Sequence, residues 1–391
     1  MKKTWILVSL LGLALLVACA PPVPTEPVQA SADLVEILEQ EIERLRLAFN
    51  IPGLSVAMLG GQEVVLARGF GYADVENETP ATEDTPYYIA SCTKPVAAAV
   101  LLKLVEEGRL DLDAELADTL ETTTFPFPGN PIRGYAGLCE MIQALSQDTS
   151  GPTAPYRFLF EDYRCDTESI TVRHHLTHTS QGTPGETYRY NGFLYGLLSW
   201  VVEAAAGESF ADTLVQTITG PLEMTSTLPN PDDSRRQEIL ARLAKPYRID
   251  DTGNAILSEF TQDLNAGAGM VSTVLDLAKF DIAMDRNLIV SEGSKEAMFR
   301  PTVSDAGRTL PYGMGWFVQE CEGMRLVWHY GHQPTYSSLI LKVPQEGLTL
   351  ILLANSDGLS ASFNLGGGDV LESPFAATFV RLFIDGETIV P

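Results

Sequence analysis

The sequence is short of cysteine, histidine and basic residues, and each shortage narrows the functions that the protein can serve. Its 391 residues include five cysteines, five histidines, and 26 Lys and Arg against 51 Asp and Glu, a formal net charge of −25. Such a surface repels nucleic-acid backbones, so we expect no nucleic-acid partner. His174 and His178 have the spacing of an H-E-x-x-H zinc motif, but the glutamate is absent. We therefore expect no metal and no other cofactor.

The N-terminus has the pattern of an export signal. Residues 1–18 begin with Lys2 and Lys3 and continue as an apolar run that is short for a membrane span but typical of a signal peptide. The letters LVAC ending at Cys19 resemble a bacterial lipobox, and the Pro-rich residues 19–31 are typical of an extended tether. We expect an exported bacterial lipoprotein, anchored to a membrane through lipid on Cys19, on the periplasmic or cell-surface side. An ordinary cleaved signal, with Cys19 incidental, is the alternative.

Export makes disulfides possible for the other four cysteines. Cys139 and Cys165 lie in one loop-rich region, and a bridge between them is one of several possible pairings. Cys92 can be a reactive thiol or a small buried packing residue, and the second role is the commoner one for a free cysteine.

Residues 32–391 have the pattern of a single α+β domain, and 45% of the whole chain is hydrophobic, enough for a large core. Strand patterns occur near the start of this domain, around the turn Gly60-Gly61, and again between residues 312 and 356. Helical apolar spacing occurs at 33–49, 91–107, 193–206 and 273–285. We expect an antiparallel sheet formed by N- and C-terminal segments and flanked by helices, with an inserted, mainly helical lobe and a cleft between the two.

Two further features lie outside this regular pattern. Residues 120–166 are rich in Pro, Gly, Thr and aromatics, and they are too long for an ordinary connection. We predict an irregular surface insertion there. Near the C-terminus, Ser373 is predicted to cap a last helix, with Pro374 at a position where proline is tolerated.

Ser91 and Lys94 stand at the start of the predicted helix 91–107. Pro95 places the helix start near Ser91, because the missing N–H of proline is harmless only in the first turn. The helix dipole there favours developing negative charge, and Lys94 lies on the same face as Ser91. A neutral Lys94 could accept the Ser91 proton if burial lowered its pKa from ~10.4 toward ~7–8. These residues alone are better explained by a capping serine and a solvent-facing lysine.

The surrounding segments change this balance. "GYADVENETPATEDTPYYIASCTK" resembles the lead-in to the S-x-x-K motif of the serine beta-lactamase and penicillin-binding-protein superfamily. Its class C branch, which includes D-alanyl-D-alanine peptidases, D-aminopeptidases and esterases, is the most similar. Further matching segments follow in the order of that branch: "ITVRHHLTHTSQG", "PGETYRYNGFLYGLLSWVVEAAAGESF", "NAGAGMVSTVLDLAKF", "PYGMGWFV" and "WHYGHQPTYSSLILKVP". The resemblance runs from about residue 33 to the C-terminus and is interrupted mainly by 120–166.

The resemblance implies a role for each matching residue of the first two motifs. Ser91 would be the nucleophile and Lys94 its proton partner. Tyr190 would assist as general base and then return a proton to the leaving group, with its pKa lowered by a cation such as Lys94. This is acyl transfer by double displacement, without metal or cofactor.

The third motif would be His329-Tyr330-Gly331, on a strand that runs along the cleft opposite the nucleophile. Gly331 would let substrate approach the backbone closely. The backbone N–H of His332 and that of the nucleophile itself would form the oxyanion hole. Tyr330 stands where a small hydroxyl residue is usual, which puts recognition of a substrate carboxylate in doubt.

The second motif departs from the family pattern as well. Gly192 stands where the family has asparagine, and Asn191 lies one position early. Gly192 cannot offer the amide that would bind the acyl-amide arm of a penicillin or peptide. The alternative register, with Asn191 in place, would put Arg189 at the position of the phenol, and we reject it.

We therefore expect a serine hydrolase that acts through an acyl-enzyme on small-molecule ester, peptide or beta-lactam-like substrates, with esterase or peptidase activity favoured over true beta-lactamase activity. The alternative is a non-catalytic binder of cell-wall peptides or beta-lactams, which the changes at Gly192 and Tyr330 motivate. Retention of the serine, lysine and tyrosine argues against it, because a binder needs none of the three. A zinc hydrolase at the histidine cluster 174–178 is a further rival.

Overall fold

The computed structural model describes residues 31–126, 131–151, 154–229 and 233–384. The predicted signal peptide, Cys19 and most of the predicted tether lie outside these ranges. Within the described ranges, no helix is both long enough and apolar enough to cross a membrane.

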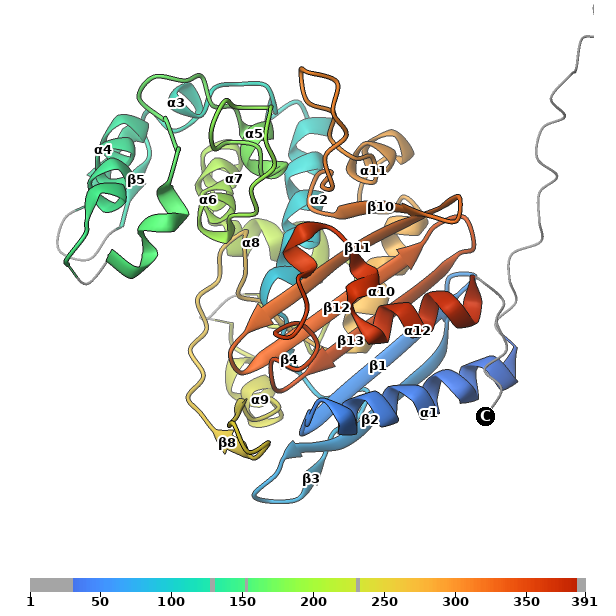
Figure 1. Ribbon diagram of the computed structural model, residues 1–391. Helices are drawn as coiled ribbons and strands as arrows, with labels where there is room; N and C mark the ends of the chain where they lie inside the picture. The colour runs from blue at the N-terminus through green and yellow to red at the C-terminus, as the bar shows by residue number, and fades with distance from the viewer. Residues whose placement is uncertain (1–30, 127–130, 152–153, 230–232, 385–391) are drawn as a thin grey trace, which may run out of the picture.

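A seven-stranded antiparallel sheet forms the centre of the described domain, in the order β10-β11-β12-β13-β1-β2-β3 (Figure 1). Its strands are β1 (Gly53–Gly60), β2 (Glu63–Asp74), β3 (Thr79–Pro80), β10 (Phe317–Cys321), β11 (Met324–Gln333), β12 (Tyr336–Val343) and β13 (Leu348–Ala354). Strands from the two ends of the chain are neighbours, with Leu54 of β1 opposite Ala354 of β13. The sheet of N- and C-terminal segments is therefore confirmed.

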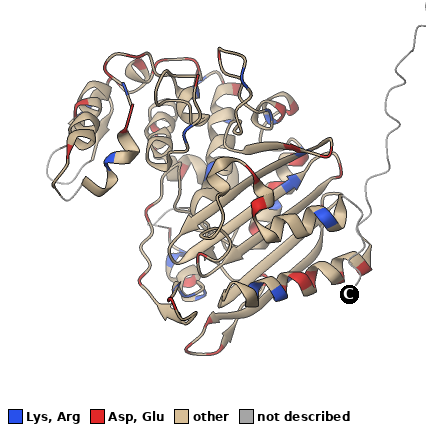
Figure 2. Ribbon diagram, in the orientation of Figure 1, with Lys and Arg blue, Asp and Glu red and all other residues tan. Residues whose placement is uncertain are grey.

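The central strands β1, β12 and β13 are buried on both faces of the sheet, whereas most of β2 is not. Successive side chains of a strand point to opposite faces. On β1, Val56 and Met58 pack in the cluster beneath α1 (Ala32–Ala48) and α12 (Pro374–Phe383). Ala57 and Leu59 belong to the other cluster, which also contains α2 (Thr93–Glu106) and α10 (Val274–Asp285). Charged residues are concentrated on α1 and on loops, whereas most of the sheet is uncharged (Figure 2).

The helical lobe lies at one side of the sheet, next to α2 (Figure 1). Its helices are α3 (Leu116–Thr119), α4 (Gly134–Gln147), α5 (Val172–Leu176), α6 (Gly192–Gly196), α7 (Leu198–Ala206) and α8 (Phe210–Leu214), followed by the π-helical turn η3 (Val215–Thr219). Other helices are α9 (Arg236–Ala241) and α11 (Glu292–Met298), and short strand pairs are β4 (Tyr87–Tyr88) with β9 (Val271–Ser272), β5 (Thr124–Phe125) with β6 (Ile132–Arg133), and β7 (Tyr247–Ile249) with β8 (Ala255–Leu257).

Two local expectations differ from the structure. The strand expected from residue 312 begins only at Phe317, because Gly315 has φ +82° and leaves no room for a Cβ, which would lie 2.4 Å from Ala98 Cβ on α2. Ser373 occupies the N-cap position of α12, but its side chain accepts no capping hydrogen bond. The serine hydroxyl is buried without a partner among the described residues.

The region 120–166 is less irregular than predicted, because it contains the 14-residue helix α4. The apolar residues Leu138 and Ile142, four positions apart, are buried on one face of this helix. Pro and Gly in the flanking sequence hid this spacing. Figure 1 places α4 at the outer end of the lobe.

The predicted bridge between Cys139 and Cys165 is present and joins α4 to the segment that follows η2 (Ala154–Phe160). It closes a loop with a sequence separation of 26. Replacing both cysteines with serine is expected to destabilise the domain by about 2–4 kcal/mol, because the unfolded chain regains the closed loop's conformational freedom. Thermal unfolding of the double variant, compared with the oxidised parent protein, measures this loss. Equal stability of oxidised and reduced parent protein would contradict the prediction.

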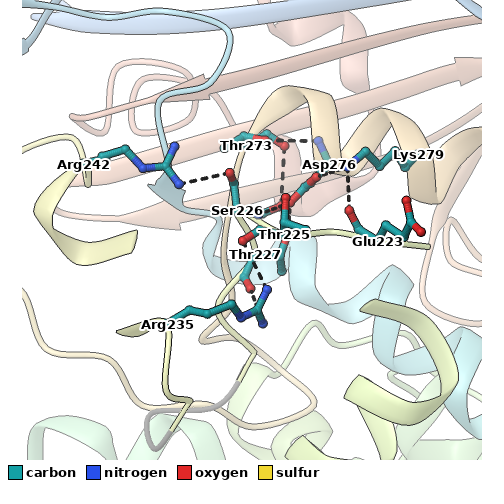
Figure 3. A network of polar contacts seen from close by, with 10 residues as sticks. Glu223, Thr225, Ser226, Thr227, Arg235, Arg242, Thr273, Asp276 and Lys279 are labelled. Atoms are coloured by element: carbon teal, nitrogen blue, oxygen red, sulfur yellow. Dashed lines mark hydrogen bonds and ion pairs between the residues drawn. The ribbon is translucent and has the colours of Figure 1, made fainter. Parts of the chain in front are cut away.

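A polar network fixes the loop after η3 to the first turn of α10 (Figure 3). Asp276 accepts hydrogen bonds from Ser226 N (2.8 Å), Thr227 Oγ1 (2.9 Å) and Lys279 Nζ (2.8 Å). The side chain of Thr273 caps α10 by accepting from Asp276 N. These contacts satisfy a buried carboxylate and the start of a helix, so the network is structural.

Candidate active site

Ser91 lies in the short turn η1 (Ala90–Cys92), directly before α2. The preceding residue, Ala90, has φ +47°, a left-handed conformation that costs free energy in a residue with a Cβ. Two contacts hold the turn in place: Ser338 Oγ donates to Ile89 O (2.7 Å), and the Cys92 thiol donates to a carbonyl of β11 (3.4 Å). The fold therefore fixes Ser91 where the first turn of α2 meets the sheet.

Lys94 is fully buried one turn after Ser91. Its Nζ donates to Ser91 Oγ (2.9 Å) and to Gly267 O (2.8 Å). None of the salt bridges within the described ranges involves this lysine. Burial without a carboxylate partner lowers the pKa of Lys94 from 10.5 to about 7. The expected lowered pKa is therefore confirmed, and a large fraction of Lys94 is neutral at neutral pH.

Tyr190 lies over this pair, with Lys94 Nζ 4.9 Å from the centre of its ring. Its hydroxyl is buried and makes no hydrogen bond of ordinary geometry within the described part of the chain. Burial raises the pKa of Tyr190 well above 10, and the nearby Ser91 offsets only part of this effect. The expectation that a cation lowers this pKa was wrong, because desolvation exceeds every favourable interaction. The phenol is therefore neutral, and Lys94 is the group with a pKa suited to accept a proton.

His178, just after α5, holds the segment that contains Tyr190. Arg189 N–H donates to His178 O (2.9 Å), and Asn191 N–H donates to His178 Nδ1 (3.2 Å), so both neighbours of the tyrosine are bound to one residue. The imidazole also packs against the Tyr190 ring, with centroids 4.4 Å apart. Because Nδ1 accepts, the proton of the neutral ring is on Nε2, which is buried without a partner among the described residues.

The position of His178 could not be assigned from the sequence. The residue has φ +56°, and burial lowers its pKa well below 6.5. A strained, neutral and buried histidine beside a candidate catalytic group indicates a positioning role. The sequence showed this residue only as part of a possible metal motif.

The third motif lies on β11, as expected, but two of its residues have a different environment from the predicted one. A Cβ on Gly331 would lie 2.4 Å from Ile89 O and 2.1 Å from Ser338 Oγ, so the glycine makes room for η1 rather than for substrate. His329 is fully buried, donates from Nδ1 to Tyr330 O (2.7 Å) and accepts at Nε2 from Tyr312 Oη (2.9 Å). Burial lowers the pKa of His329 well below 6.5, so it supplies no positive charge.

His332 is exposed at the end of β11, and its Nδ1 lies 3.0 Å from Ser360 Oγ. In the sheet register it lies opposite Ser337, one residue beyond the contact between β11 and η1. The oxyanion hole formed by the backbone N–H groups of Ser91 and His332 stays a prediction. Tyr330 packs against Tyr190, with ring centroids 5.9 Å apart.

The altered second motif has a clear structural basis. Asn191 Oδ1 accepts from Leu194 N–H (3.0 Å) and caps α6, while its Nδ2 donates to Gln181 Oε1 (2.9 Å). Asn191 therefore turns its amide into the lobe, away from the candidate nucleophile. At Gly192 a Cβ would have only Lys94 Nζ within 4 Å, at 3.8 Å, so this position borders the site and offers it no side chain.

The histidine cluster has separate hydrogen-bond partners. His174 Nδ1 accepts from Thr171 N–H (3.1 Å), and His175 donates from Nδ1 to Leu194 O (2.6 Å). Within the described ranges, no group of three or more His, Cys, Asp or Glu residues could hold a metal ion. Cys92 is also buried, and burial raises its pKa to about 12, which fits a packing role.

Comparisons with known proteins agree with this geometry. A family model described as Beta-lactamase matches residues 38–371, and the chain belongs to this family. It is 27% identical over 347 residues to penicillin-binding protein 4* of Bacillus subtilis (strain 168), covering 82% of this chain and 71% of that protein. It is 28% identical over 342 residues to protein flp of Staphylococcus aureus (strain NCTC 8325 / PS 47), covering 82% of this chain but only 62% of that protein.

Solved structures show the same fold. The octameric penicillin-binding protein homologue from Pyrococcus abyssi matches with a TM-score of 0.66 and 26% identity, over 89% of this chain and 77% of that one. D-amino acid amidase from Ochrobactrum anthropi SV3 matches with a TM-score of 0.64 and 21% identity, over 91% of this chain and all of that one. The second match bears on the fold alone. Together with the family, these findings support a serine-hydrolase type of activity.

Proposed function

We propose that this protein is a serine hydrolase that cleaves ester or amide bonds through an acyl-enzyme on Ser91. The observation that supports this most directly is the Ser91–Lys94 pair, with 2.9 Å between Oγ and Nζ and a Lys94 pKa of about 7. A general base is most effective when its pKa lies near the working pH. A lysine with only a structural role would be expected to face solvent or to pair with an acidic residue. Lys94 does neither, because it is fully buried and forms no salt bridge within the described ranges.

The proposed reaction has two halves. Ser91 Oγ attacks the substrate carbonyl carbon while its proton passes to neutral Lys94, and the oxyanion forms at the first turn of α2, where the helix dipole is favourable. The bond to the leaving group then breaks. The Tyr190 hydroxyl donates its proton to the leaving alcohol or amine, and Lys94 passes the Ser91 proton on to Tyr190. Water, deprotonated by Lys94, attacks the acyl-enzyme, and the acid is released with Ser91 restored.

Esterase or peptidase activity is favoured over true beta-lactamase activity. Gly192 supplies no amide for the acyl-amide arm of a penicillin. His329 is neutral, so β11 supplies no cation there for a substrate carboxylate. An ester without either group loses nothing from these changes, whereas a beta-lactam or a peptide ending in carboxylate loses binding free energy.

Hydrolysis of a short-chain p-nitrophenyl ester tests the proposal. The parent protein is expected to release p-nitrophenol, and Ser91→Ala is expected to release none. Ser146→Ala, on α4 at the outer end of the lobe, is the matched control and should keep full activity. Binding of a cell-wall peptide or beta-lactam without turnover, unaffected by Ser91→Ala, would support the non-catalytic binder instead.

His178→Asn tests how Tyr190 is positioned. Asparagine tolerates the left-handed backbone of this position but removes the ring that packs on Tyr190 and changes the acceptor for Asn191 N–H. We expect kcat to fall by up to about 10²-fold with little change in KM, because small misplacements of a catalytic group are costly. Steady-state kinetics over a range of pH measures this. A change in KM alone, with kcat intact, would contradict the positioning role.

The sequence of the first 31 residues supports a further proposal about location. We propose that the protein is exported and anchored to a membrane through lipid on Cys19, with the Pro-rich tether between anchor and domain. Membrane partition of the full-length protein, compared with a Cys19→Ser variant, tests it. A soluble parent protein with an unmodified thiol would overturn it.

A further inference from the structure

A cavity of about 490 Å³ lies in the helical lobe beside the candidate active site. It is formed by α6, α7, α8 and the segment 262–265, and its apolar lining includes Phe193, Leu197, Trp200, Phe210 and Leu264. Gly192 belongs to the same lining and borders Lys94, and the carbonyl of Gly267, just after the segment, accepts a hydrogen bond from Lys94. The cavity therefore adjoins the candidate active site at Gly192, although Ser91 and Lys94 are not among its lining residues, and its volume suits a small ligand group.

The charged groups of this cavity have one sign. Glu203 and Asp263 line it, and none of its described lining residues is Lys, Arg or His. Glu203 is half-buried. Within the described ranges its one hydrogen bond is a long contact of 3.5 Å from Phe210 N–H, and it takes part in no salt bridge. Burial raises the pKa of Glu203, and no cation within the described ranges offsets this desolvation of the carboxylate.

We propose that the cavity receives the acyl side chain of the substrate and that Glu203 selects chains ending in a cation, such as a primary ammonium. The methylene groups of such a chain would pack against Trp200 and Phe210, while the ammonium would form a charge-assisted hydrogen bond with Glu203. The aromatic lining adds a favourable environment for a cation. A chain ending in carboxylate would face repulsion in a partly desolvated site. This inference rests on the proposed function, because the acyl group is the one transferred to Ser91.

The test is a series of p-nitrophenyl esters whose unbranched acyl chains increase in length and end in methyl, ammonium or carboxylate. With the full-length protein, kcat/KM at neutral pH is expected to favour the ammonium ester by about tenfold over the methyl ester of similar length, the value of one charge-assisted hydrogen bond. The carboxylate ester is expected to be the slowest. Glu203→Gln keeps the size of the side chain and should remove the preference, so that the ratio of kcat/KM for the ammonium ester to kcat/KM for the methyl ester falls to about one.

Glu208→Gln is the matched control, because Glu208 lies outside the cavity and binds Gln216 Nε2 (2.6 Å). It changes the net charge by the same amount, so a preference that falls equally in both variants would reflect the acidic surface and overturn the proposal. Turnover of every ester with equal kcat/KM, or a preference for methyl that Glu203→Gln leaves unchanged, would also overturn it while leaving the serine-hydrolase proposal intact. Absence of turnover with any ester would instead count against the esterase function itself.

Discussion

Lys94→Met is expected to abolish turnover while leaving the protein at least as stable as the parent at neutral pH. Methionine fills most of the same volume, but it cannot accept the Ser91 proton. Loss of a general base typically costs about 10²–10⁴-fold in rate. Because neutral Lys94 is the active form, kcat/KM of the parent protein should rise with pH through about 7 as the amine loses its proton.

The stability of this variant follows from the same pKa shift. Burying Lys94 lowers its pKa from 10.5 to about 7. At a pH where the amine is charged in both states, this shift lowers the free energy of unfolding by about 5 kcal/mol. Between pH ~7 and ~10.5 the Lys94 amine is protonated in the unfolded chain but mostly neutral in the folded protein, so the stability of the parent rises with pH in this range. Below pH ~7 the parent carries the full cost of the buried amine. Methionine avoids the penalty, although Gly267 O loses its donor at a cost of about 1–3 kcal/mol.

Thermal unfolding on both sides of this window, together with the pH–rate profile, checks the prediction. The stability advantage of Lys94→Met should be largest below pH ~7 and shrink toward pH ~10. Lys94→Arg is the companion variant, because it keeps a side chain that cannot become neutral and should also be inactive. A parent rate that is independent of pH around neutrality would show that Lys94 is not the base.

Most of the sheet could be predicted because its signals are local. The hairpin around Gly60-Gly61 and the last strands consist of apolar runs separated by turn residues, and helix α1 has an uninterrupted apolar spacing. Strand patterns at both ends of the chain predicted that N- and C-terminal segments share one sheet, but the order of the strands within it was not predicted. Ser91, Lys94 and Tyr190 were also found in the sequence, because their spacing resembles a known family, and the structure brings all three together.

What could not be predicted depends on contacts between distant segments. The pKa of Tyr190 follows from burial beneath several elements, and the sequence suggested only its charged neighbours. Gly331 appeared to serve substrate, but its missing side chain makes room for Ile89, which lies 242 positions earlier in the chain. The role of His178 likewise depends on backbone groups of residues 189 and 191, whose distance from the histidine no local pattern shows.

Lys342→Met is expected to cause the largest loss of stability. Lys342, on β12, is almost completely buried, and its Nζ lies 2.5 Å from Asp281 Oδ1 and 3.1 Å from Asp285 Oδ1, both on α10. Burial alone would lower the pKa of Lys342, but the two carboxylates raise it above 10.5, so the lysine stays charged. Removing it leaves buried Asp281 without a cation, which typically costs about 3–5 kcal/mol.

The loss should depend on pH in a definite direction. Burial already raises the pKa of Asp281 above its ordinary value, and without Lys342 it would rise further. A carboxyl with a raised folded pKa binds more protons in the folded state, so stability falls as pH rises from the unfolded pKa of about 4 toward the folded one. The deficit of Lys342→Met should therefore be small near pH ~4 and close to its maximum at neutral pH.

Two further variants separate this charge effect from a simple packing defect. Adding Asp281→Asn to Lys342→Met removes the unpaired charge and should recover about half of the lost stability at neutral pH, since a buried pair replaced as a whole costs little. Arg44→Met removes the cation of a surface ion pair with Glu41 on α1, where the Arg44 side chain is 59% exposed, and it should cost less than about 1 kcal/mol. If the double variant were as unstable as Lys342→Met alone, with no dependence on pH, lost packing rather than the stranded carboxylate would explain the deficit. Recovery in the double variant would instead show that the unpaired Asp281 carboxylate, and not lost packing alone, causes much of the deficit.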